Sequence, residues 1–121
     1  MTDNEYAEMM LGKLAKSKFR SSFSIEPKDR EYFDKKGREV IARHAYELLR
    51  DRVGPAEPKN DGKQTPFRGH PVFTAQHATA TCCRGCIKKW HHILQHRPLT
   101  VAELQRLSTL VMVWIDRQMQ Q

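Results

Sequence analysis

Cysteine and histidine, the side chains that bind zinc most often in proteins, are concentrated in one stretch of this 121-residue chain. Residues 62–97 hold all three cysteines and five of the six histidines, and they contain no Asp or Glu. Cys83 and Cys86 have the Cys-x-x-Cys spacing that directs two thiolates at one ion. We therefore predict a zinc site that two histidines complete. The predicted ligands are His77, Cys83, Cys86 and His91, with His70, Cys82 and His92 as substitutes.

The same cysteines have a simpler interpretation as packed, unreactive thiols. If residues 82–94 form one regular helix, the two cysteines of the motif lie on the same face as Ile87 and Trp90, a pattern typical of a helix that faces the core. The spacings of the flanking histidines also match no zinc-finger rule. Metal binding and structural free thiols therefore both stay open, and free thiols would fit a protein-interaction domain.

An enzyme could use the same cluster in two ways. A cysteine activated by His77 or His91 would serve as a nucleophile. A zinc hydrolase would need a carboxylate base beside a metal-bound water, but the nearest acids, Asp61 and Glu103, stand at the edges of the acid-free window. A thioredoxin-like role is disfavoured because no strand is predicted before the Cys-x-x-Cys motif. The sequence assigns no catalytic residue.

The charge of the chain is unevenly distributed. The net charge is +7, of which residues 1–60 carry +2 and residues 61–121 carry +5. A local excess of cations attracts phosphate groups, so we predict a basic face that engages nucleic acid. The sequence shows no aromatic pattern suited to stacking on bases. The cations of the predicted face are Lys63, Arg68, Arg84, Lys88 and Lys89.

Two amphipathic helices are predicted on either side of the cluster. Apolar residues recur at helical spacing over residues 27–52, and we predict one long helix there despite Gly37. A second apolar stripe follows Thr100 and Glu103, which have the spacing of a capping box. This stripe predicts a final helix that ends at about Gln118.

The remaining segments are shorter or less regular. Residues 53–71 are rich in turn residues and lack periodicity, which predicts a long loop. Shorter helices are predicted from Pro71 and over residues 82–94, with a break between them. Residues 1–18 predict a flexible or helical N-terminal arm, and residues 19–121 a single helical domain. The expected fold is mainly α, a small single-domain structure of three to five helices with a long mid-chain loop.

A long signature surrounds the cysteines, carried by residues 60–66, 68–73, 75–86 and 89–91. This signature resembles that of a bacterial and phage family catalogued as domain of unknown function 4186. The similarity extends from about Phe19 to the helix that contains Ile115, and the first 18 residues fall outside it. The resemblance implies a small bacterial or phage-borne protein and transfers no activity. In the family pattern, the site candidates are His77, Cys82, Cys83, Cys86 and His91.

The expected compartment follows from the N-terminus and the cysteine count. No apolar stretch of signal-peptide length follows Met1, and no run approaches the ~18 apolar residues of a membrane span. We therefore expect a soluble, cytoplasmic protein. Its three cysteines should be reduced thiols or metal ligands, because an odd number does not make a disulfide framework.

Overall fold

The computed structural model describes residues 1–121 and contains six α-helices, one short 3-10 helix and no strand. This architecture confirms the predicted mainly α, single-domain fold. None of the helices is both long enough and apolar enough to cross a membrane. In chain order the elements are α1 (Asp3–Leu14), η1 (Arg20–Ser22), α2 (Pro27–Lys36), α3 (Arg38–Arg52), α4 (Pro71–Ala78), α5 (Arg84–His91) and α6 (Val101–Met119).

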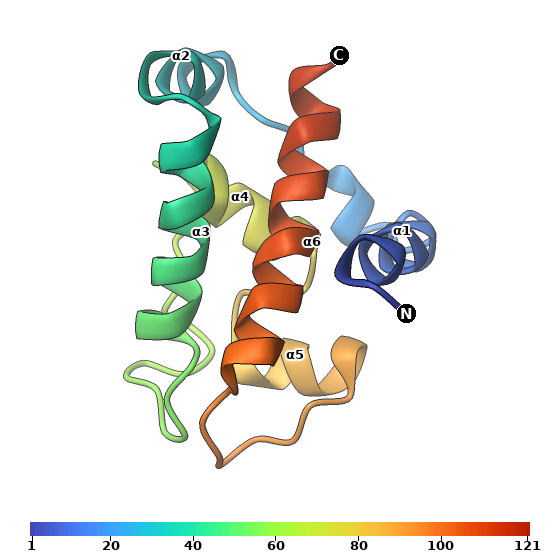
Figure 1. The fold of residues 1–121 in the computed structure, drawn as a ribbon, viewed down its shortest axis with the longest axis vertical. Coiled ribbons are helices and arrows are strands. Elements are labelled where there is room, and N and C mark those ends of the chain that lie inside the picture. The colour runs from blue at the N-terminus through green and yellow to red at the C-terminus, as the bar shows by residue number, and fades with distance from the viewer.

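Helix α6 is the element on which α1, α3 and α4 all pack. In Figure 1, α3 runs alongside α6, and α1 lies on the other side of α6 from α3. Helix α6 begins at the predicted capping box, in which the Thr100 hydroxyl accepts from the Glu103 N–H at 3.1 Å and the Glu103 carboxylate accepts from the Thr100 N–H at 2.9 Å. The predicted final helix is therefore confirmed. Its buried residues are Leu104, Leu107, Leu110, Val111, Met112, Trp114 and Ile115.

The N-terminal segment forms a packed helix. Thr2 and Glu5 exchange hydrogen bonds of 3.1 Å and 2.8 Å in a second capping box, which satisfies the free N–H groups at the start of α1. Of the two states predicted for residues 1–18, flexible or helical, the structure has the helix as far as Leu14. The small apolar cluster between α1 and α6 consists of Ala7, Met10, Leu14, Ala80 and Leu110.

The predicted single helix over residues 27–52 is wrong, because Gly37 divides it. Helix α2 ends at Lys36, Gly37 has φ 88° and ψ 153°, and α3 begins at Arg38. Glycine enters the region of positive φ without the steric cost that a Cβ atom would impose. The chain therefore turns here, and α2 lies across the end of α3 in Figure 1. The break raises the number of α-helices to six, above the three to five predicted.

The chain between α3 and α4 contains no helix or strand, which confirms the long mid-chain loop. Side-chain hydrogen bonds hold this loop in place. The buried Gln64 accepts from the Gly62 N–H at 2.7 Å and donates to the Asp61 carboxylate at 3.1 Å. The Thr65 hydroxyl donates to the Cys82 carbonyl at 2.7 Å, so the loop is attached directly beside the cysteines.

The predicted break between α4 and α5 is present, but it spans residues 79–83 and extends beyond the predicted 79–81, because α5 begins only at Arg84. Ala80 has φ 58°, a left-handed conformation that the helical path cannot accommodate. The second helix is shorter than the predicted 82–94, because it comprises only Arg84–His91. Cys83 stands before it as the N-cap, with an extended backbone at φ −159° and ψ 166°.

Candidate metal centre

The sulfur atoms of Cys82, Cys83 and Cys86 converge at the start of α5, where all three lie within 4.8 Å of one another. As the N-cap, Cys83 accepts a hydrogen bond on its Sγ from the Cys86 N–H at 3.4 Å. This bond holds the Cys83 sulfur over the first turn of the helix. Cys82 is 6% exposed, whereas Cys83 and Cys86 are partly exposed. The regular helix over residues 82–94 that the packed-thiol interpretation assumed is therefore wrong.

Arg20, from η1, is the charged partner of this cluster. Its guanidinium donates to the Cys86 Sγ at 3.1 Å and to the Cys82 Sγ at 3.7 Å. A further hydrogen bond of 2.7 Å, to the His77 carbonyl, holds the side chain, which is only 8% exposed. Positive charge beside a thiol stabilises the thiolate. The sequence did not predict this role, because Arg20 closes a basic run that is typical of an exposed segment.

Hydrogen bonding distributes the protons unequally among the three thiols. Hydrogen bonds from Cys82 and Cys83, together with the Arg20 guanidinium, hold the pKa of the Cys86 thiol far below its ordinary value. Hydrogen bonding to the other two sulfurs, followed by burial, raises the pKa of Cys82. The cluster therefore favours a thiolate at Cys86. A thiolate is the form of cysteine that binds a metal ion or attacks an electrophile.

His77 and His91 lie beside the cluster, but their rings bind backbone carbonyls. Because a carbonyl only accepts, Nε2 of His77 donates to Thr65 at 3.0 Å and Nε2 of His91 donates to Thr79 at 2.9 Å. The Nδ1 of His91 then accepts from the Tyr6 hydroxyl at 2.5 Å, which uses both nitrogens of that ring. The group of close ligand atoms is therefore made of sulfur alone. The ligand set His77, Cys83, Cys86 and His91 stays a prediction.

The substitute histidines have other partners. His70 is the N-cap of α4, where its Nδ1 accepts from the Val72 N–H at 3.0 Å. Its Nε2 lies 3.1 Å from the Nδ1 of His44, and since Nδ1 of His70 is already an acceptor, the neutral ring donates through Nε2. His92 is exposed and ends α5 in a left-handed conformation at φ 58°. The structure therefore does not bring these two rings to the sulfurs.

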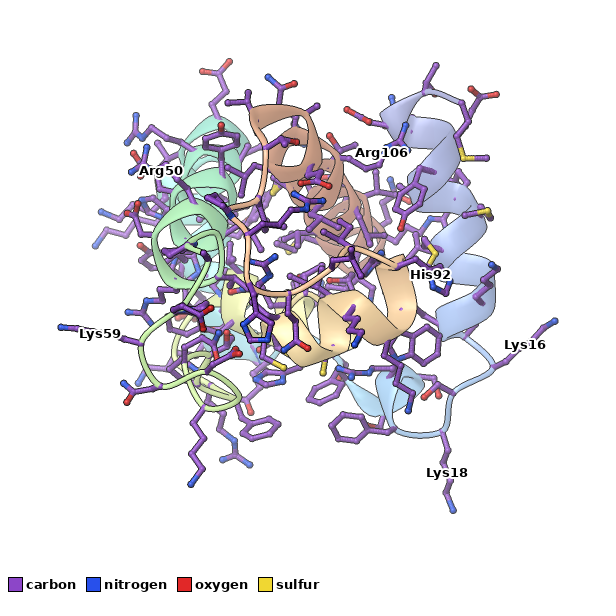
Figure 2. The ribbon with its side chains drawn as sticks, turned by 90° about the horizontal axis from the view of Figure 1, so that it is seen from below. Lys16, Lys18, Arg50, Lys59, His92 and Arg106 are labelled. Atoms are coloured by element: carbon purple, nitrogen blue, oxygen red, sulfur yellow. The ribbon has the colours of Figure 1, made fainter.

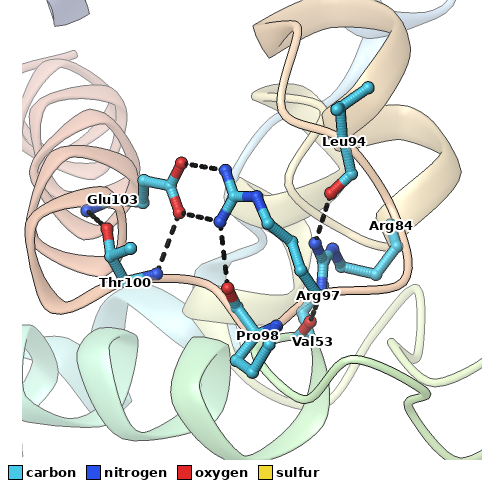
Figure 3. Close-up of polar contacts among 7 residues, drawn as sticks. All are labelled: Val53, Arg84, Leu94, Arg97, Pro98, Thr100 and Glu103. Carbon is cyan, nitrogen blue, oxygen red and sulfur yellow. Dashed lines mark hydrogen bonds and ion pairs between the residues drawn. The ribbon is translucent and has the colours of Figure 1, made fainter.

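Arg84 does not belong to the predicted basic face, because its side chain is fully buried. As the first residue of α5, it extends into the neighbouring loops, as Figure 3 shows. One of these loops is the connector between α5 and α6, and the Arg97–Glu103 ion pair, at 2.6 Å, attaches this connector to α6. Arg84 is thus a structural residue that joins the loop after α3 to the connector before α6. Its guanidinium donates to the carbonyls of Pro55 at 2.9 Å, Leu94 at 2.8 Å and Val53 at 3.4 Å.

Two exposed aromatic rings lie near the thiol cluster, and the sequence analysis did not single them out. Phe19 is 54% exposed and Phe67 is 59% exposed. Phe67 stacks on the ring of His77, with centroids 4.1 Å apart and planes 12° apart. The Arg20 guanidinium lies 5.0 Å from the centroid of Phe19. Phe23 lies between the two exposed rings, with its centroid 5.2 Å from that of Phe19 and 6.4 Å from that of Phe67.

Acid is expected to destabilise the fold through His70 and His91 as the pH falls from 6.5 to about 4. Burial lowers the pKa of each ring from 6.5 to about 4, and the neighbouring His44 adds to the shift at His70. The unfolded chain binds these protons first, so the stabilisation is complete above pH 6.5 and is lost below it. For the deeply buried His91 the loss is about 3 kcal/mol. Urea unfolding at a series of pH values measures it.

A variant at His70 separates this effect from general acid denaturation. His70→Asn keeps a capping side chain that does not titrate, so it should lose less stability than the wild type over the same pH range. His92→Asn is the matched control, because His92 is exposed and asparagine tolerates its left-handed backbone. If the His70→Asn profile follows that of the wild type, His70 has no part in the acid response.

A family model described as Domain of unknown function (DUF4186) matches residues 8–116. The match covers nearly the whole chain and confirms the resemblance seen in the sequence signature. It also extends that resemblance, because residues 8–18 lie inside the match although the signature left them out. The three cysteines, Arg20 and both exposed phenylalanines fall within the matched residues. No solved structure matches this chain significantly.

Proposed function

This chain belongs to the DUF4186 family, and we propose that it binds a thiophilic metal ion, zinc, through Cys82, Cys83 and Cys86. The observation that carries the proposal is the convergence of the three sulfurs within 4.8 Å. Three thiolates bound to one zinc ion at about 2.3 Å each lie about 4 Å from one another. The sulfurs are therefore already close to the separation that coordination requires.

The charge of the neighbouring groups supports this site. Three thiolates around a divalent ion leave one negative charge, and the Arg20 guanidinium, 3.1 Å from the Cys86 Sγ, offsets it. Hydrogen bonds to ligating sulfurs are a common way for a protein to orient and stabilise metal ligands. Arg20 would thus act as the outer partner of the metal-bound thiolates.

Three protein ligands leave one position of a tetrahedral zinc ion for another group. Structural zinc sites fill all four positions with protein side chains, whereas sites that bind a water or a substrate keep one position open. Cys83 and Cys86 are partly exposed, so solvent reaches this side of the cluster. The proposed centre therefore has an exchangeable fourth ligand.

A second candidate function is thiol chemistry without a metal. The observation that favours it is the hydrogen bond from Arg20 to Cys86, which helps to lower the pKa of a thiol that is partly exposed. Such a thiolate is a competent nucleophile, and Cys83 stands at the spacing of a disulfide partner. The metal content of the purified protein separates the two candidates, since a bound ion would occupy this thiolate.

Zinc analysis of protein purified without added metal tests the proposal. We expect about one zinc ion per chain. Cys82→Ser, Cys83→Ser and Cys86→Ser should each lower zinc affinity by more than the roughly 10- to 100-fold that loss of an outer partner costs. The measurement is competition with a chromogenic chelator. Little zinc in the wild type, with or without supplementation, would rule out the metal site.

Two histidine variants serve as matched controls for the ligand set. His77→Gln and His91→Gln each keep an N–H donor for the carbonyl that the ring now binds. With a three-cysteine site, both should retain the wild-type zinc affinity. If either loses zinc as a cysteine variant does, a histidine is a ligand and the originally predicted mixed set is correct.

We also propose that the exposed cations bind nucleic-acid phosphates. Four of the five predicted residues, Lys63, Arg68, Lys88 and Lys89, support this proposal because they are exposed, whereas Arg84 is buried. The window of residues 62–102 contains no acidic side chain that would repel phosphate. Binding of this kind must weaken as the salt concentration rises, because released counterions drive it.

A further inference from the structure

We infer that Phe19 and Phe67 form a stacking surface for single-stranded nucleic acid, an inference that rests on the proposed phosphate binding. Phe19 is 54% exposed and Phe67 is 59% exposed, and exposed apolar side chains mark an interaction site when they form one contiguous patch. Phe23 lies within 5.2 Å and 6.4 Å of the two rings, so both belong to one continuous aromatic surface. This surface is built from the η1 segment and the mid-chain loop, which are distant in sequence.

Both exposed rings are supported by neighbouring side chains. His77 covers one face of Phe67 at a centroid distance of 4.1 Å, and the high exposure of Phe67 means that its other face is open. Phe19 makes a T-shaped contact with Phe23 and lies under the guanidinium of Arg20. Hydrogen bonds to two sulfurs and to the His77 carbonyl hold that guanidinium in place. Rings supported in this way lose little conformational entropy when a base stacks on them.

The charge around the rings suits a polyanion. Residues 9–25, which carry Phe19, contain no acidic side chain, and neither do residues 62–102, which carry Phe67. Figure 2 shows Lys16 and Lys18 projecting from the chain that follows α1. Glu26, just beyond the first of these stretches, has its carboxylate 3.8 Å from Arg68, which partly offsets its charge. Cations on both aromatic-bearing segments can therefore contact a phosphate backbone that runs past the rings.

The combination of open ring faces and cations favours a single strand over a duplex. Bases in a duplex stack on one another and present only their edges, whereas an unpaired base offers its face to a ring. Phenylalanine has no polar group with which to read base edges, so the contact should depend little on sequence. An acidic peptide would satisfy the cations but would leave the rings without a planar partner.

Fluorescence anisotropy with a labelled oligothymidylate of about 15 nucleotides tests the inference. Phe19→Ala and Phe67→Ala should each weaken binding by roughly 5- to 150-fold, the range measured for loss of one base-stacking side chain. Phe67→Trp should restore or strengthen binding, because it keeps a ring at the same place. Leu94→Ala is the matched control, since Leu94 is 65% exposed and lies on the connector before α6.

Three results would overturn the stacking surface. One is a double Phe19→Ala/Phe67→Ala variant that binds the oligothymidylate as tightly as the parent while its circular dichroism is unchanged. Another is a duplex of equal length that binds as well as the single strand. The third is a polyglutamate that displaces the strand at equal charge concentration, which would assign the surface to acidic peptides. If the parent binds no strand at low salt, the proposed phosphate binding itself fails, whatever the rings do.

Discussion

Replacement of Arg84 by alanine is expected to lower the free energy of unfolding by about 3 to 5 kcal/mol. The side chain is fully buried and donates three hydrogen bonds, so its removal leaves three backbone carbonyls without their charged partner. A buried acceptor that loses its donor costs about 1 to 3 kcal/mol. The loop after α3 and the connector before α6 would lose the hydrogen bonds that join both of them to the start of α5. Urea denaturation followed by circular dichroism measures the change.

Two variants show whether guanidinium geometry or charge alone is responsible. Arg84→Lys keeps the charge but offers a single ammonium in place of a planar fork, so it should recover only part of the loss. Arg68→Ala removes an arginine whose side chain is 83% exposed, and it should change the stability by less than about 0.5 kcal/mol. An Arg84→Ala protein as stable as Arg68→Ala would contradict the role described for Arg84.

Replacement of Arg20 by glutamine is expected to raise the pKa of the Cys86 thiol and to shift the pH profile of its alkylation to higher pH by about one unit. The guanidinium lies 3.1 Å from this sulfur and helps to lower the pKa of Cys86, so its loss reduces the thiolate fraction. Glutamine can still donate to the His77 carbonyl, which preserves the local structure. Mass spectrometry of iodoacetamide-treated, metal-free protein gives the rate at each cysteine.

The control for this experiment is a charge change that does not touch sulfur. Arg38→Gln removes an arginine that pairs with Asp116 at 2.8 Å on the surface, and it should leave the alkylation rate of Cys86 unchanged. In both proteins Cys86 should react before Cys82, which is buried and whose pKa is raised. Faster labelling of Cys82, or an Arg20→Gln pH profile that coincides with that of the wild type, would show that the guanidinium does not activate the cluster.

Local patterns in the sequence predicted those parts of the fold that local interactions determine. The spacing of Thr100 and Glu103 predicted the start of α6, and the capping box is present in the structure. The apolar pattern over residues 27–52 did not reveal the break at Gly37, because periodicity reports buried faces and not the backbone angle at one residue. Glycine permits both the helical and the positive φ conformation, and tertiary packing decides between them.

The candidate site was predictable only where its members are close in sequence. The density of cysteines between Cys82 and Cys86 indicated a cluster, and their sulfurs do converge. Arg20 lies 66 residues from Cys86, and no local pattern connects them. The charge of Arg84 suggested a solvated face, since composition does not show which long side chain turns inward. Phe19 and Phe67 likewise become one surface only after the chain has folded.

Arg20 contacts both the thiol cluster and the exposed aromatic surface, through hydrogen bonds to two sulfurs and through the ring of Phe19. If the proposals hold, an ion bound by the sulfurs and a base stacked on Phe19 would both act on this one guanidinium. By thermodynamic reciprocity, whatever factor zinc applies to the affinity for a strand, the strand must apply to the affinity for zinc. Titrating each ligand in the presence of the other would measure this coupling twice, independently.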